Sequence, residues 1–142
     1  MSQALEDIRN LCRRYLDECD LKYSVDEDND FALPYTGDVL VYVMPRDWVE
    51  GKTVVQVIAI TNKGVRVDDK LGAFLSVENG KMLFGKLALY PDRAEVRMEQ
   101  TLLGDWLNRE ELRTAIRIVA QMADEYDDKI KDGWGGKKFR ES

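Results

Sequence analysis

Two runs of β-branched and other apolar residues constrain the fold of this chain most strongly. They are VLVYVM at residues 39–44 and KTVVQVIAI at residues 52–60. Such residues favour strands, and in both runs the two sides of the strand are largely hydrophobic. An antiparallel sheet with helices on one face usually has a wet, polar second face. Something should therefore cover that face: the chain's own helices, including a short central one, a second subunit or an extended partner.

The rest of the sequence predicts an alternation of helices and strands. Asn108 and Glu111 have capping-box spacing, so they predict the start of a long last helix, which Gly133 and the following glycines end. The expected elements are, in order, a helix over 3–19, strands over 23–25 and 31–35, a turn at 36–38, the two runs above, a helix over 68–79 closed by the Asn-Gly pair at 79–80, strands over 82–90 and 94–103, and the last helix from 109.

This order, α-β-β-β-β-α-β-β-α, predicts an α+β fold with an antiparallel twisted sheet flanked by helices. We expect a single domain over 1–133 and a flexible C-terminal tail over 134–142. The chain has 142 residues and a net charge of −6. The acidic balance argues against nucleic-acid and membrane partners, because both carry negative charge. The N-terminus does not resemble a signal peptide, and no apolar run is long enough to span a membrane.

The residues available for catalysis are few. Histidine is absent, which removes the commonest general base and zinc ligand. Cys12 and Cys19 lie about 10 Å apart on one predicted helix, too far for a disulfide, and indicate a reducing cytoplasm. The acidic run DEYDDKI, residues 124–130, fits the wet side of the last helix, with Glu125–Lys129 and Asp127–Lys131 ion pairs. We therefore predict no enzyme, and no catalytic, cofactor-binding or metal-binding residue.

The candidate binding residues are apolar. Val54 and Ile58 belong to the second strand run, and Trp48 and Val49 follow the first in a loop, where Trp48 is the expected exposed anchor. Two further tryptophans have structural interpretations. Trp106 is expected to pack at the start of the last helix, and Trp134 to fold back on its end.

Two stretches resemble the YbjN domain family, whose fold is that of type III secretion chaperones. They are NGKMLFGKLALYPDRAEVRMEQTLLGDWLNREEL at 79–112 and ADEYDDKIKDGWGGKKF at 123–139. The first resembles the family's strand pair leading into its last helix, and the second the end of that helix. The resemblance implies a helix-flanked twisted sheet, a tendency to dimerise, and protein or peptide binding, with no catalytic residue to carry over.

Three hypotheses of function follow. The first is a non-catalytic, dimeric, chaperone-like module or regulatory adaptor of the bacterial cytoplasm, which binds a protein or peptide segment and whose acidic charges select basic or neutral partners. The second is a small-molecule-sensing regulator with a pocket between sheet and helix. The third is a carboxylate-dependent hydrolase.

Overall fold

The computed structural model describes residues 2–35 and 39–139. Its elements are α1 (Gln3–Glu18), β1 (Ser24–Val25), β2 (Phe31–Tyr35), β3 (Val39–Asp47), β4 (Thr53–Lys63), α2 (Asp69–Lys81), β5 (Lys86–Tyr90), a 3-10 turn (Pro91–Arg93), β6 (Glu95–Leu103), α3 (Arg109–Trp134) and β7 (Lys137–Lys138). The predicted order is confirmed. The predicted turn at 36–38 lies outside the described residues.

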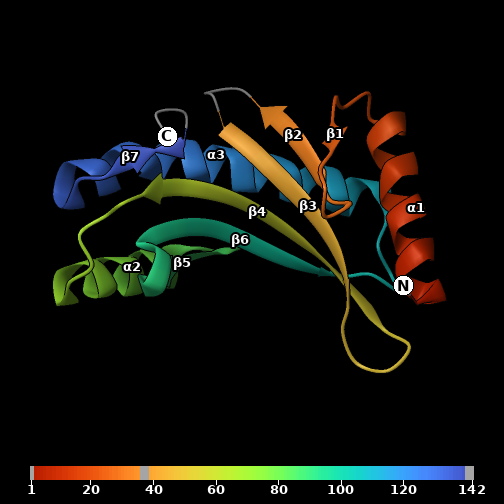
Figure 1. Cartoon of the computed structure of the whole chain (residues 1–142), viewed down its shortest axis with the longest axis horizontal. Helices are drawn as coiled ribbons and strands as arrows, with labels where there is room; N and C mark the ends of the chain where they lie inside the picture. Colours follow the sequence, from red (N-terminus) through yellow and green to blue (C-terminus); the bar gives the residue numbers. More distant parts are fainter. Residues whose placement is uncertain (1, 36–38, 140–142) are drawn as a thin grey trace.

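All strands belong to one antiparallel sheet in the order β1-β2-β3-β4-β6-β5, and β7 pairs with the end of β4. Figure 1 shows α3 running behind the sheet, with α1 and α2 at opposite ends. Alternate strand residues point to these helices: Val41, Val43, Val55 and Val57 have no exposed surface. They join Leu16 of α1, Leu71 of α2 and Ile116 of α3 in one core.

The three helices all pack on the same face of the sheet. α3 contacts β3, β4 and β6, α1 contacts β3 and β4, and α2 contacts β5. Leu71 and Leu75 of α2 are buried in this core, and Phe74 of α2 packs edge-on against Tyr126 of α3. Two of the proposed covers for the second face are therefore wrong: neither the short central helix nor the other helices lie on it.

Several element ends differ from the sequence prediction. α2 passes through Asn79 and Gly80, because the Asn79 side chain accepts the Leu87 N–H and donates to the Leu87 carbonyl instead of capping a turn. β3 continues through Pro45, since β2 ends its pairing at Phe31–Val43 and a residue without N–H is tolerated where a strand has one free side.

The C-terminal residues also differ from the predicted flexible tail. Trp134 is the last residue of α3, packs its ring on Phe74 of α2 and donates from Nε1 to Asp68 Oδ1 at 3.0 Å. Lys138 pairs with Asn62 of β4 and its ammonium lies 2.8 Å from Asp128 Oδ1. Residues 134–139 are therefore attached to the helix layer and the sheet.

Candidate functional site

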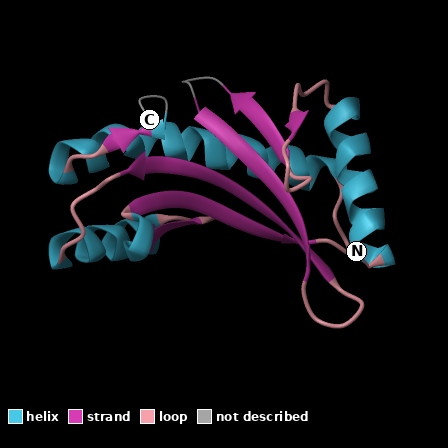
Figure 2. Ribbon diagram, in the orientation of Figure 1, coloured by secondary structure: helices cyan, strands magenta, loops and turns pink. Residues whose placement is uncertain are grey.

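The second face of the sheet is the candidate site, because no helix in the described ranges packs on it (Figure 2). The register lines up its side chains in rows: Tyr42 of β3 lies beside Ile58 of β4, and Ile58 beside Glu99 of β6. The apolar members of this open face include Leu40, Tyr42, Met44, Val54, Ile58, Ile60 and Leu103.

A cavity of about 270 Å³ hollows this face. Its floor is formed by Tyr42, Met44, Ile58 and Ile60, with Arg97 of β6 on one side. The loop between β1 and β2, which carries three aspartates, completes its lining together with Arg46. The site thus combines an apolar floor with charged walls, as ligand-recognition surfaces commonly do.

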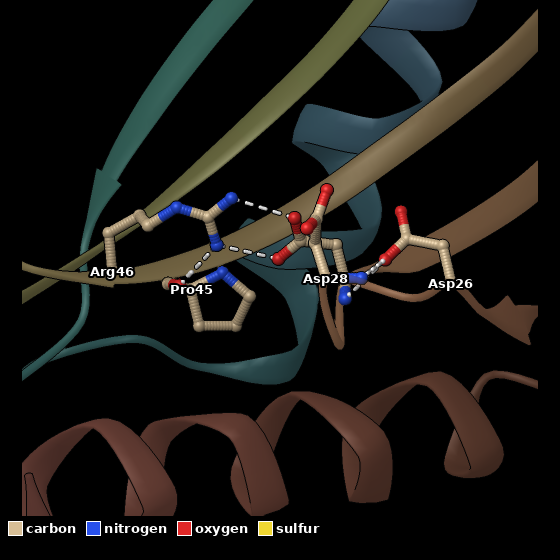
Figure 3. Close-up of polar contacts among 5 residues, drawn as sticks. Asp26, Asp28, Pro45 and Arg46 are labelled. Atoms are coloured by element: carbon tan, nitrogen blue, oxygen red, sulfur yellow. Dashed lines mark hydrogen bonds and ion pairs between the residues drawn. The ribbon is translucent and has the colours of Figure 1, made fainter. Parts of the chain in front are cut away.

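An ion pair fixes the charged wall (Figure 3). The guanidinium of Arg46 donates to both carboxylate oxygens of Asp30, at 2.6 and 2.7 Å, and to the Pro45 carbonyl at 2.9 Å. Asp30 is only 2% exposed, whereas the Arg46 side chain is 40% exposed. The hydrogen bond to Asp30 raises the pKa of Arg46, burial opposes this, and the charges of Asp28 and Asp26 add to it.

The loop itself is ordered by Asp26. Its Oδ1 accepts the backbone N–H groups of Asp28 and Asp30, both at 2.9 Å, in an Asx-type turn. Three aspartates therefore lie around Arg46, and the second lining arginine, Arg97, pairs with Glu95 at 2.9 Å, which leaves a surplus of negative charge beside the apolar floor. Burial, followed by the charge of Asp26, raises the pKa of Tyr42, so its hydroxyl stays protonated at neutral pH. Electrostatics at this end of the site favours a cationic ligand group.

The structure brings together only two of the four residues predicted to bind a partner. Val54 and Ile58 both lie on the open face, where Val54 is half-buried and Ile58 is 6% exposed because its neighbours on the sheet cover it. Trp48 and Val49 instead form the tip of the β3–β4 hairpin, which projects beyond the sheet (Figure 1), and they are 60% and 52% exposed.

Two exposed apolar residues near this hairpin were not found from the sequence. Trp106 was expected to pack on the last helix, but it is 68% exposed and lies under the ammonium of Lys52, 5.4 Å from the ring centroid. Lys52 in turn pairs with Asp105 at 3.1 Å. Leu103, which lies opposite Val54 on the open face, is 52% exposed.

The charged loop was also not found from the sequence. The run DEDND at residues 26–30 has the composition of a turn, and Arg46, the partner of Asp30, lies 16 residues further along in an apolar strand. The run around Asp127 is mostly as predicted: Asp124, Glu125 and Asp128 are exposed, and Glu125 pairs with Lys129 at 3.5 Å. Asp127 is the exception. It is buried against the sheet, and the described residues include no Asp127–Lys131 ion pair.

Neither cysteine forms a disulfide. Burial raises the pKa of the Cys12 thiol to about 12, against a lowering effect of Arg9. Within the ranges 2–35 and 39–139, no three His, Cys, Asp or Glu side chains gather as metal ligands would, and no helix there is both long and apolar enough to cross a membrane.

Comparison with known families decides the classification. A family model described as T3SS (YopN, CesT) and YbjN peptide-binding chaperone 1 matches residues 6–142. The chain belongs to this family. The expected resemblance to YbjN and to secretion chaperones is thereby confirmed. No curated protein matches the sequence.

Solved structures show that the fold is shared with proteins of very different sequence. The HopA1–SchA chaperone–effector complex contains a chain that matches with a TM-score of 0.68 at 7% identity. The match covers 90% of the present chain and 98% of the chain in that complex. YbjN from E. coli has a TM-score of 0.58 at 17% identity, covering 85% and 92%. The Yersinia pestis type III secretion chaperone SycH, solved with a fragment of YscM2, has a TM-score of 0.56 at 17% identity, covering 82% and 96%.

Proposed function

We propose that this protein is a non-catalytic, chaperone-like module or regulatory adaptor that binds a polypeptide segment on the open face of its sheet. One observation carries the proposal: in the described part of the chain the three helices pack on one face of the sheet, and no helix lies over Tyr42, Met44, Ile58 and Ile60 on the other. A contiguous apolar surface of this kind typically marks an interaction site.

The charges around the face define the preferred segment. Asp26 and Asp28 stand beside the apolar floor. Of the two arginines that line the cavity, Arg46 is already engaged by both oxygens of Asp30, and Arg97 pairs with Glu95 at 2.9 Å. A segment that places a lysine or arginine against these aspartates and an apolar side chain over Ile58 satisfies both parts of the cavity. One of the similar chains comes from a chaperone–effector complex, and the type III secretion chaperone SycH was solved with a fragment of YscM2, which supports a polypeptide as the partner class.

A dimer of the 16.4 kDa chain and a cytoplasmic location complete the proposal. Trp48 and Val49 at the hairpin tip add exposed apolar surface close to Val54, at the same end of the sheet, and extend the proposed contact beyond the face. Light scattering on the purified protein measures the mass directly. We expect twice the chain mass.

Capture of partners from the native host's lysate tests the binding surface. The wild type is compared with Val54→Asp on the open face and with Val77→Asp, an exposed position on α2 that serves as the matched control. The proposal expects a saturable partner that Val54→Asp loses and Val77→Asp keeps, with circular dichroism unchanged in both variants. Equal capture by both variants would contradict the open face as the binding surface.

The small-molecule-sensing alternative also has one supporting observation. A cavity of about 420 Å³ lies between β6 and α3, where that hypothesis expects a pocket, and this volume is within the range of ligand sites. A metabolite that raises Tm in wild type but not in an Ile118→Asp variant would support it, because a ligand of the native state stabilises that state by mass action.

A further inference from the structure

The cavity between β6 and α3 continues into a groove. Its apolar walls are Phe84, which precedes β5, Leu102 of β6, and Ala115 and Ile118 of α3. A second cavity of about 310 Å³ shares Phe84 and Ile118 with the first and extends along α3 to Met122 and Tyr126. Phe84 is 58% exposed and the preceding Leu83 is 92% exposed, so the groove has an unusually apolar lip. An elongated groove suits a chain segment better than a compact metabolite.

An unpaired strand edge borders this groove. β6 pairs with β4 as far as Leu103, but its pairing with β5 ends at Glu99, opposite Lys86. Gly85 explains the early end: it has a φ of +76°, and a Cβ there would lie 2.4 Å from Met98 Cε and 3.1 Å from the Glu99 carbonyl oxygen. The chain crosses close to β6 at this point. Among the described residues, those at 100–103 therefore have a strand neighbour on one side only.

A buried acceptor lies at the same place. Gln100 lines the groove, and its Oε1 is inaccessible to solvent and accepts no hydrogen bond from any described residue. A buried polar atom without a partner is unfavourable, so such atoms in native structures often mark a missing ligand or water. An N–H donor arriving along the edge of β6 would satisfy it.

At its β6 end the groove carries an acidic side chain, Glu111, that no cation among the described residues pairs with. Glu110 already pairs with Arg113 at 2.9 Å, whereas the Glu111 carboxylate accepts from the neutral amide of Asn108 at 2.9 Å. Both glutamates line the cavity beside Leu102, near the C-terminal end of β6. A strand that runs antiparallel to β6, as all its neighbours do, would place its N-terminal residues there.

We propose that this groove is a second polypeptide-binding site, separate from the open face. Its occupant is an extended segment of another protein that adds to β6 at residues 100–103 as an antiparallel strand. Alternate apolar side chains of that segment fill the groove over Ile118, and a lysine or arginine at its N-terminal end meets Glu111. The contacts that support this groove are separate from those of the open face, so either proposal can fail while the other holds.

A designed peptide tests the site directly. The probe is Lys-Lys-Val-Thr-Val-Thr-Val-Thr with a C-terminal fluorescein, and binding is followed by fluorescence anisotropy. We expect Ile118→Asp to weaken binding by about tenfold, as truncation of a central apolar contact does. Val77→Asp, an exposed position on α2, is the matched control and should leave affinity unchanged. Glu111→Gln should weaken binding by about threefold, as loss of a solvent-exposed charge pair does.

Hydrogen exchange on the full-length protein gives a second readout. Binding in the proposed register slows exchange of the backbone amides at 100–103, and circular dichroism of each variant shows that its fold is kept. Three results would overturn the proposal: no binding up to about 1 mM peptide, binding that Ile60→Asp on the open face abolishes while Ile118→Asp leaves it intact, or a doubling of mass that Phe84→Ser abolishes, which would assign the groove to a second copy of the chain.

Discussion

Replacing Arg46 by methionine removes the cation that holds the β1–β2 loop on the sheet. Methionine keeps much of the apolar stem, so the change isolates the loss of the guanidinium. Asp30 is then left 2% exposed without its bidentate partner. Removing one member of a fully buried pair typically costs about 3–5 kcal/mol, whereas an exposed pair contributes about 0–1 kcal/mol.

This pair lies between those limits, because Asp30 is buried and the Arg46 side chain is 40% exposed. We therefore expect Arg46→Met to lower the free energy of unfolding by roughly 2–3 kcal/mol. For a chain of this length that corresponds to a fall in Tm of roughly 6–12 °C. Urea denaturation followed by circular dichroism measures the change, with Arg93→Met, an exposed arginine in the β5–β6 turn, as the matched control.

A double-mutant cycle completes the test. Asp30→Asn alone should also destabilise the protein, but the double variant Asp30→Asn/Arg46→Met should be no less stable than Arg46→Met, since it removes the uncompensated buried carboxylate. A loss below about 0.5 kcal/mol in Arg46→Met, within the range of ordinary surface substitutions, would refute the reasoning. So would strictly additive effects of the two single changes.

Three further predictions concern the helices. Asn108→Ala removes the side chain that accepts the Glu111 N–H at the start of α3, and should cost about 1 kcal/mol in urea unfolding; an unchanged midpoint would contradict a capping role. Cys12 has no exposed surface, and burial raises its pKa to about 12, so only about one in 10⁴ of its thiols is ionised at pH 8. A disulfide reagent should therefore modify Cys12 only after unfolding. Rapid labelling of Cys12 in the native protein would contradict this burial. Burial is the main cause that raises the pKa of Asp127, so ionisation of this carboxyl destabilises the native state as the pH rises. Asp127→Asn should therefore raise Tm at pH 7, by an amount that vanishes as the pH falls toward 4. An equal difference in Tm at both pH values would contradict the linkage.

The sequence predicts the order of the elements well, because each depends on a local pattern. The β-branched run around Val55 favours a strand in any context, and Asn108 with Glu111 specifies a helix start within four residues. The end of α2 could not be found this way. Asn79 is a common helix-ending residue, but its side chain here binds the backbone of Leu87, which only the tertiary fold brings near.

The location of the candidate sites depends even more on the pairing register of the strands, which the sequence does not give. The sequence indicates that Val54 and Ile58 belong to a strand apolar on both sides, but not which side the helices cover. The partnership of Asp30 with Arg46 follows from the β2–β3 and β3–β4 pairings rather than from spacing. The free edge of β6 exists because β5 begins late, at Lys86, which depends on the close approach of Gly85.

The six isoleucines of the chain offer the most direct test of the proposed open-face function. Ile58 and Ile60 report on the open face, Ile118 on the groove, and Ile8, Ile116 and Ile130 on the core. The measurement is a titration of δ1-methyl-labelled protein with a peptide selected against it from a random library, followed by NMR. The open-face account predicts saturable shifts of the Ile58 and Ile60 methyl signals while the core methyl signals stay in place. Binding that leaves both of these signals unmoved would contradict it.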